Sequence, residues 1–239
     1  MISKATGAAG VGASTVPNHG TGPGPSPRAA LHNLRVMPVP FRIAKELLVR
    51  KHYLHSMPGG TQLSFGVFVD GRLMGAMTLG VGPKLGHRLV EGATSRDCAT
   101  LTRFWLSDRL PSNAESRVIG VVLRALTKNT SLKFVLAYAD PAAGHIGVIY
   151  QATGWLYTGL SSPTSVYDLG DGVLRHSRSL GYSFGSRSVR HFEANGVPIK
   201  AVTQSAKHRY IRFLDSSWRE RLSGPELKYP KKEDARGGP

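Results

Sequence analysis

Residues 133–138, with the sequence KFVLAY, constrain the fold more than any other segment because they form a near-continuous apolar run. Such a run is typical of a strand that is covered on both faces of a sheet. A strand at residues 100–106 and a helix that begins at Ser112 precede it. If the two strands are parallel, the connection between them must be right-handed. The sequence therefore predicts a strand–helix–strand unit inside an α/β sheet.

Further helices and strands are predicted before and after this strand–helix–strand unit. Apolar side chains at helical spacing predict a helix over residues 41–52. Residues 63–69 and 73–79 read as two strands joined by a tight Asp70-Gly71 turn. Glu115 follows Ser112 by three residues, the spacing of a capping box, at the start of the central helix. A short helix at residues 145–153 and a strand at 155–158 follow. This order of helices and strands along the chain predicts a mixed central β-sheet flanked by helices.

The ends of the chain differ in composition from its centre. Residues 1–30 carry almost no large apolar side chains, so they cannot offset the entropy of ordering. We expect a flexible leader at residues 1–35, a catalytic core at 36–160, a basic extension packed on the core at 161–227, and a flexible tail at 228–239.

The charge indicates a polyanionic partner. The chain has 31 Lys and Arg against 15 Asp and Glu, a formal net charge of +16 that is spread along its length. Nucleic acid fits this charge, because neutralising phosphates releases counterions. An anionic membrane fits less well, since no long amphipathic helix pairs a basic face with an apolar one. No apolar run reaches the ~18 residues of a membrane span, and one cysteine allows no internal disulfide. We expect a soluble cytosolic protein; a basic enzyme without a polyanionic partner is the alternative.

The turn after the apolar strand has the residue types of a reactive site. Asp140 lies at the carboxyl end of that strand, where ligands bind in open α/β sheets. His145 follows by five residues, so the two side chains can share a proton or a metal. The alternative for Asp140 is a helix N-cap before Pro141.

Two further regions carry candidate site residues. His52 and Tyr53 close the first helix, where the helix dipole alone also favours a histidine. Arg103 lies inside an apolar strand, which is costly unless the charge is paired or faces a site. Ser116 and Arg117 lie in the first turn of the central helix, an end that binds anions; an ordinary polar first turn is the alternative.

Residues 207–213 alternate basic with aromatic or apolar side chains. Basic side chains contact phosphates while aromatic ones pack or stack, so this segment indicates nucleic-acid binding through Lys207, His208, Arg209 and Arg212. The alternative is an amphipathic strand with a basic exposed face. No phosphate-loop, dinucleotide, CxxC, HExxH or GxSxG pattern occurs.

Taken together, these motifs resemble the phage Mom DNA-modification proteins over about residues 38–232. The signature block matches at residues 137–141 (AYADP), 144–147 (GHIG), 149–155 (IYQATGW) and 157–159 (YTG). Further matches are residues 50–53 (RKHY), 65–67 (FGV), 102–105 (TRFW), 113–117 (NAESR), 207–210 (KHRY) and 229–231 (YPK).

The resemblance implies a GNAT-like fold and an enzyme that converts adenine in double-stranded DNA to N6-carbamoylmethyladenine. This modification shields phage DNA from host restriction, in the cytoplasm of the infected bacterium. The matching site residues are His52, Tyr53, Arg103, Ser116 and Asp140, with Tyr138, His145 and Tyr150 close by.

The resemblance does not identify the molecule that donates the carbamoylmethyl group. GNAT acetyltransferases hold coenzyme A on an Arg-x-x-Gly-x-Gly/Ala turn, which here corresponds to residues 109–114. Ser112 replaces a glycine and Pro111 has no N–H to donate, while Ser112, Asn113 and Arg117 remain the candidate cofactor contacts. Acetyl-CoA or another small acyl- or glycyl-type donor is expected, and an iron on His52, Tyr53 and Asp140 is a further expectation.

Two other functions stay open from the sequence. One is an N-acyltransferase that uses acetyl-CoA on a protein or a small amine. The other is a DNA-binding protein without enzymatic activity. The sequence does not indicate an oligomeric state.

Overall fold

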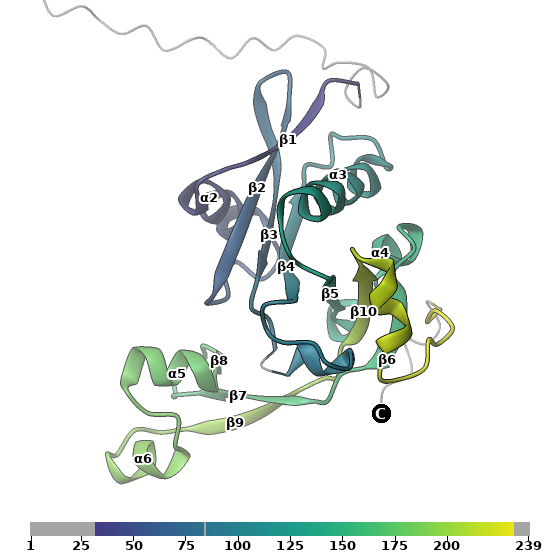
Figure 1. Ribbon diagram of the computed structural model, residues 1–239. Helices are drawn as coiled ribbons and strands as arrows, with labels where there is room; N and C mark the ends of the chain where they lie inside the picture. The colour runs from purple at the N-terminus through teal and green to yellow at the C-terminus, as the bar shows by residue number, and fades with distance from the viewer. Residues whose placement is uncertain (1–31, 84, 232–239) are drawn as a thin grey trace, which may run out of the picture.

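A mixed β-sheet forms the centre of the molecule (Figure 1). The computed structural model describes residues 32–83 and 85–231, so most of the predicted leader and residues 232–239 of the predicted tail lie outside it. Within the described residues this sheet has seven strands in the order β1-β2-β3-β4-β5-β10-β6. The strands are β1 (Leu34–Pro38), β2 (Thr61–Val69), β3 (Arg72–Gly80), β4 (Cys98–Leu106), β5 (Phe134–Ala139), β6 (Leu156–Leu160) and β10 (His208–Phe213).

The predicted strand–helix–strand unit is confirmed. β4 and β5 are parallel, whereas the other neighbours in this sheet are antiparallel. β5 is covered on both faces because its buried residues alternate between two apolar clusters: Val135 and Ala137 pack with α3 (Ala114–Asn129), and Phe134 and Leu136 pack on the opposite side. The predicted fold class, a mixed α/β sheet flanked by helices, is therefore confirmed.

The other helices pack on the central sheet or lie in the connections between its strands. α2 (Phe41–Lys51) packs Ala44, Leu47 and Leu48 against β3, as the helical spacing predicts. α4 (Val148–Ala152) and the short 3-10 helices η1 (Gly86–Leu89), η2 (Pro141–Ala143) and η3 (Ser216–Arg221) lie at the ends of strands. The β2–β3 hairpin turns at Asp70 and Gly71, both with positive φ, as predicted.

Three local predictions differ from the structure. α3 begins at Ala114 after an Asn113 N-cap that makes no side-chain capping bond, so Ser112 and Glu115 do not form a capping box. The predicted helix at residues 145–153 shortens to α4, because Gly147 has φ +79° and interrupts it. The predicted leader extends to residue 35, yet Leu34 is buried in strand β1, which pairs with β2.

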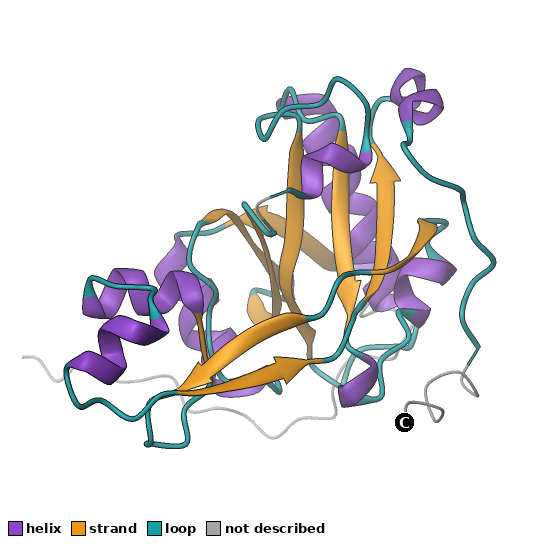
Figure 2. Ribbon diagram, turned by 90° about the horizontal axis from the view of Figure 1, so that it is seen from below, coloured by secondary structure: helices purple, strands orange, loops and turns teal. Residues whose placement is uncertain are grey.

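Residues 161–207, which we call the arm, leave the central sheet between two of its neighbouring strands, β6 and β10. The arm has its own sheet of β7 (Thr164–Asp168), β8 (Arg175–His176) and β9 (Lys200–Gln204), in the order β8-β7-β9. Helices α5 (Ser177–Phe184) and α6 (Val189–Ala194) lie at its far end, away from the core (Figures 1 and 2). The prediction of one extension packed on the core at 161–227 therefore differs from the structure: the arm projects, and β10 is an inner strand of the central sheet.

The described part of the predicted tail packs against the core. Tyr229 donates its hydroxyl to the carbonyl of Trp155 at 2.9 Å. Gln151 donates to the carbonyl of Pro230 at 3.3 Å, and Pro230 is buried. Among the residues described, no helix has the length and apolar character that a membrane crossing requires.

Candidate active site

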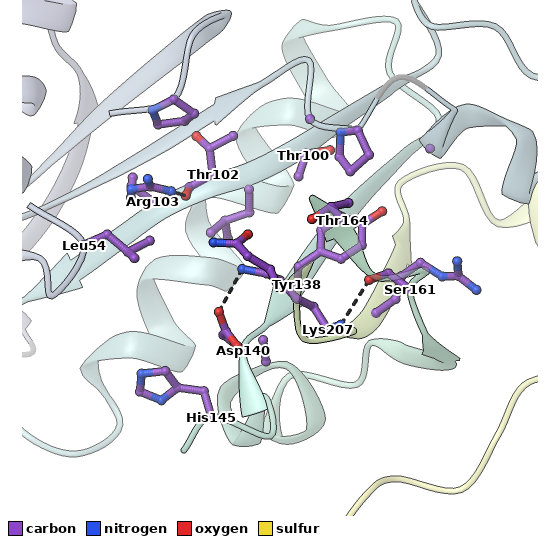
Figure 3. Close-up of a pocket in the computed structure, with 18 of the residues that line it drawn as sticks. Leu54, Thr100, Thr102, Arg103, Tyr138, Asp140, His145, Ser161, Thr164 and Lys207 are labelled. Carbon is purple, nitrogen blue, oxygen red and sulfur yellow. Dashed lines mark hydrogen bonds and ion pairs between the residues drawn. The ribbon is translucent and has the colours of Figure 1, made fainter. Parts of the chain in front are cut away.

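The central sheet opens where its two parallel strands separate. Backbone pairing of β4 with β5 runs from Cys98 opposite Phe134 to Thr100 opposite Leu136. Beyond this point a cavity of about 1430 Å³ lies between the carboxyl-end halves of the two strands and the arm (Figure 3). Ligands of α/β proteins bind in such crevices, so the cavity has the position expected of an active site.

Asp140 lies at the end of β5 and is held by three groups. Its carboxylate accepts hydrogen bonds from the Ala142 backbone N–H at 3.1 Å and the Ser205 hydroxyl at 3.3 Å. It also forms an ion pair with Lys207 Nζ at 2.8 Å (Figure 3). Burial raises the pKa of the Asp140 carboxyl, but Lys207 and the other donors outweigh burial and hold the pKa below its usual value. Asp140 is thus an ionised, fixed acceptor as well as the N-cap of η2.

His52, Tyr53 and His145 bring three rings to one wall of the cavity. The Tyr53 ring is stacked on His52 at 4.5 Å and lies 5.2 Å from the His145 ring. His52 Nδ1 accepts the Leu54 backbone N–H at 3.2 Å, so in the neutral ring the proton is on Nε2. Burial, with Arg103 and other nearby cations, lowers the pKa of His52 to about 4. Neutral His52 therefore offers a hydrogen-bond donor to the cavity, and Tyr53, 50% exposed, offers a stacking surface.

Arg103 projects from β4 into the cavity. Its Nε donates to the Ser56 carbonyl at 2.9 Å and its Nη1 to the Thr102 carbonyl at 2.7 Å. No carboxylate of the described residues forms an ion pair with it. Two carbonyls fix the guanidinium plane and leave the Nη2 donors available to a ligand. The sequence-based expectation that Arg103 faces a site agrees with this placement.

Tyr138 and Tyr150 also line the cavity. Burial raises the pKa of both phenols, so both are neutral donors at physiological pH. The Tyr150 ring packs on Trp155 at 5.2 Å and on Tyr210 at 5.3 Å, which makes it part of the core as well as of the wall. Gly147 has a positive φ, and any Cβ there would overlap the Tyr210 ring, so only glycine fits at the start of α4.

The candidate cofactor contacts lie outside this cavity. Ser112, Asn113 and Arg117 are at or near the start of α3, and none of them is among the lining residues. Ser116, which was predicted as a catalytic residue, lies on the same turn and does not line the cavity either. The first-turn side chain that does line the cavity is Glu115, an acid. With Pro111 in the preceding loop and a carboxylate in the first turn, these residues do not fit a coenzyme A pyrophosphate.

The residues predicted to bind iron do not fit that ion either. Within the described chain no group of three His, Cys, Asp or Glu side chains is placed to hold a metal. The Asp140 carboxylate is already neutralised by Lys207, and Arg103 adds a cation beside His52 and Tyr53. Imidazole and oxygen ligands in this setting would meet two positive charges, which disfavours a further cation.

The segment predicted to bind DNA is mostly internal. β10 lies between β5 and β6 and is covered on both faces, so its basic residues do not form one exposed surface. His208 is 6% exposed and its Nδ1 lies 2.9 Å from the Tyr157 hydroxyl. Arg212 donates to the Gly154 carbonyl at 2.8 Å. Arg209 bonds to Thr158 through Nε and Nη2 and lines the cavity, as does Lys207.

Sequence reasoning did not connect the arm with the site: it missed Ser205, and it assigned Lys207 to DNA binding rather than to Asp140. Ser205 and Lys207, at the root of the arm, hold Asp140 from a distance of more than sixty positions along the chain. Several small hydroxyl side chains of the arm also line the cavity, among them Ser161, Thr164 and Ser177. A lysine and serines scattered in a polar segment carry no local signal, whereas the apolar strand before Asp140 does.

The fold and cavity define a mixed α/β protein with a large cavity where its parallel strands part, and the comparisons identify its family. The model described as Mom protein family matches residues 33–231. The chain is 31% identical to "Methylcarbamoylase mom" of Escherichia phage Mu over 210 residues, which covers 83% of this chain and 84% of that protein. The chain belongs to the Mom protein family.

Solved structures similar to this one are more distant. One is a GNAT family N-acetyltransferase (YhbS) from Escherichia coli in complex with CoA, with 12% identity, a TM-score of 0.45, and coverage of 86% of this chain and 91% of that one. Another is an N-acetyltransferase from Staphylococcus aureus Mu50, with 12% identity, a TM-score of 0.41, and coverage of 76% and 97%.

Proposed function

We propose that this protein is an enzyme that converts adenine in double-stranded DNA to N6-carbamoylmethyladenine, acting in the cytoplasm of a phage-infected bacterium to protect phage DNA from restriction. Membership of the Mom family and the relative named methylcarbamoylase support the reaction class. The observation that carries the proposal is the arrangement of Arg103, Asp140 and the His52–Tyr53–His145 rings around one cavity.

Asp140 is the acceptor for the proton of the nucleophile. The exocyclic N6 of adenine is a poor nucleophile because its lone pair is delocalised into the ring. When N6 bonds to the methylene carbon of the donor, the bond from that carbon to the rest of the donor breaks, and the leaving group departs with the electron pair. N6 must also lose a proton, and we assign its acceptance to the ionised carboxylate that Lys207 and Ser205 hold. The low pKa keeps the Asp140 carboxyl ionised, so that it can accept a hydrogen bond from N6–H, although it makes the carboxylate a weak base.

Arg103 binds the group that is transferred. A carbamoylmethyl group carries a carbonyl oxygen, and the Nη2 donors of Arg103 are available to it. Because two backbone carbonyls already fix the guanidinium, little rotamer freedom is lost when it binds this oxygen. The neutral His52 Nε2–H provides a second donor on the same side.

The cavity accommodates an extrahelical adenine. Enzymes that modify bases in a duplex extrude the target nucleotide at a cost of a few kcal/mol, and stack it on aromatic side chains. The half-exposed Tyr53 ring provides that surface, and a volume of about 1430 Å³ exceeds the ~300–1,000 Å³ of common small-ligand pockets. A base and a donor group therefore fit together, and the net charge of +16 favours the DNA phosphates.

Nucleoside mass spectrometry tests the proposal. Plasmid DNA is isolated from bacteria that express the protein, with and without phage infection, beside an Asp140→Asn variant. We expect an adenosine species with the mass increment of a carbamoylmethyl group in DNA from cells that express the native protein. The same species should be absent from cells that express the variant. Unmodified adenosine in both infected and uninfected cells that contain soluble, folded protein contradicts the proposal.

A further inference from the structure

The far end of the arm carries aromatic and basic side chains that the site described above does not use. Residues 173–191 contain four arginines and no acidic residue, and Asp171, just before this stretch, pairs with one of the four, Arg175. Within this stretch Tyr182 on α5 is 94% exposed, the highest value among the large apolar side chains described, and Phe184 is 47% exposed. Arg187 and Arg190 are exposed, and neither forms an ion pair with any described carboxylate. We call Tyr182, Phe184, Arg187 and Arg190 the arm tip.

Packing within the arm holds the residues of the arm tip in place. Leu180 is fully buried and fixes α5 to the arm's own core, which also holds Val166 and Phe192. A Cβ on Gly181 would lie 2.6 Å from Arg187 Nε, so the glycine allows the Arg187 side chain to lie against α5. Arg187 is therefore placed beside the residue that precedes Tyr182.

The helix that carries Tyr182 and Phe184 begins at the cavity. Ser177 and Ser179, on the first turn of α5, line the cavity. Tyr182 follows Ser179 by three positions, and residues three apart share one face of a helix. Tyr182 does not line the cavity itself; it lies one turn further along α5, on the same face as Ser179.

We infer that the arm tip contacts the DNA duplex beside the target adenine, with Tyr182 stacking on a neighbouring base and Arg187 and Arg190 on the phosphates. This inference rests on the proposed function, because it takes duplex DNA as the substrate of the cavity. An adenine can enter the cavity only if its own backbone lies at the mouth, between the arm and the core. Arg187 and Arg190, which are exposed and pair with no described carboxylate, are complementary to that backbone, and an exposed ring stacks on any base without sequence preference.

Binding of purified protein to a fluorescein-labelled duplex, followed by anisotropy at several salt concentrations, tests this inference. We expect Tyr182→Ala to raise Kd about tenfold, as loss of one stacked base does. Tyr182→Phe keeps the ring and should bind as the native protein does. Arg187→Ala with Arg190→Ala should lower the slope of log K against log salt by about two, because two phosphate contacts are lost.

The control removes the same number of charges elsewhere. Arg124 and Lys128 are exposed on α3 and lie outside the cavity lining, so their double alanine variant should keep the native slope. Native Kd and slope in the arm-tip variants would overturn the inference. A change of oligomeric state in Tyr182→Ala with unchanged duplex affinity would also overturn it, because the arm tip would then be an interface between copies.

The two proposals fail in different ways. If the native protein binds the duplex through the arm tip but cells contain no modified adenosine, the proposed reaction is wrong and the arm tip remains a DNA contact. If cells contain modified adenosine but the arm-tip variants bind and modify as the native protein does, the arm inference alone is wrong.

Discussion

The crevice between β4 and β5 and the arm tip hold their polar side chains in opposite ways. In the crevice, Asp140 has three bonded partners and Arg103 is fixed by two carbonyls. At the arm tip, Arg187 and Arg190 are exposed and have no carboxylate partner among the described residues, and Tyr182 is almost fully exposed. Groups that must act on one atom need fixed positions, whereas groups that hold a flexible polymer need access.

This contrast separates two effects that experiments can measure independently. Changes in the crevice should remove the modification and leave duplex affinity nearly intact. Changes at the arm tip should weaken duplex affinity first. A variant in either region that lowers modification and duplex affinity equally would contradict this division of roles.

The largest effect is expected for Asp140→Asn. The amide has nearly the same shape but cannot accept a proton, so the modified fraction of adenosine should fall by roughly 10²- to 10⁴-fold, the usual contribution of a positioned base. Nucleoside mass spectrometry measures the fraction, and anisotropy should show native duplex affinity. Glu193→Gln, which removes a carboxylate from α6 of the arm, is the matched control and should modify normally. Equal losses in both variants would show that net charge, not position, matters.

Arg103→Ala should reduce modification by roughly 100-fold, the typical cost of losing one preorganised donor. Arg103→Lys keeps the charge but not the planar fork that two carbonyls hold, so it should rescue only part of the loss. Arg124→Ala on α3 serves as the control for a lost arginine. Full rescue by lysine would mean that Arg103 supplies charge alone, which contradicts its role in orienting the donor.

A smaller and more specific effect is expected for Lys207→Met. The ion pair helps to hold the pKa of Asp140 below its usual value, so its loss should raise that pKa and protonate the carboxyl at a higher pH. An NMR titration of the Asp140 carboxyl carbon measures this directly. Lys207→Arg should keep the pKa low because it keeps the charge. An unchanged titration in Lys207→Met would show that the Ala142 N–H and Ser205 hydroxyl fix Asp140 without the lysine.

The sequence predicts the central sheet well because local signals determine it. The Asp70-Gly71 turn between the strands of the β2–β3 hairpin, the helical spacing of α2 and the apolar run of β5 are local signals that the structure contains. Asp140 follows from its place after such a strand. These are properties of neighbouring residues, so they can be read without knowing the fold.

The arm and its contacts with the site could not be read in this way. β6 and β10 are neighbours in space but are separated by the whole arm, and the Lys207–Asp140 pair depends on that return. The alternating basic and apolar residues of 207–213 resemble an exposed basic strand. In the structure β10 pairs with strands along both edges, and an apolar cluster covers each of its two faces. Only the tertiary structure distinguishes these two cases.

The smallest expected effect concerns stability, and it tests whether the crevice is as enclosed as its bonds indicate. Burial lowers the pKa of His52 from 6.5 to about 4, with Arg103, His145 and His55 adding repulsion. Between these values the unfolded chain binds a proton that the folded chain does not, so stability should fall as pH decreases from about 6.5 towards 4. Each unit of pKa corresponds to ~1.4 kcal/mol, and because His52 lines the cavity, solvent screens part of the shift, so the loss is on the order of 1–2 kcal/mol. His52→Gln should flatten this part of the curve in urea unfolding experiments, whereas His32→Gln, at an exposed histidine, should not. The same slope in His52→Gln as in the native protein would show that other groups cause the acid sensitivity, and that His52 is more open to water than the crevice suggests.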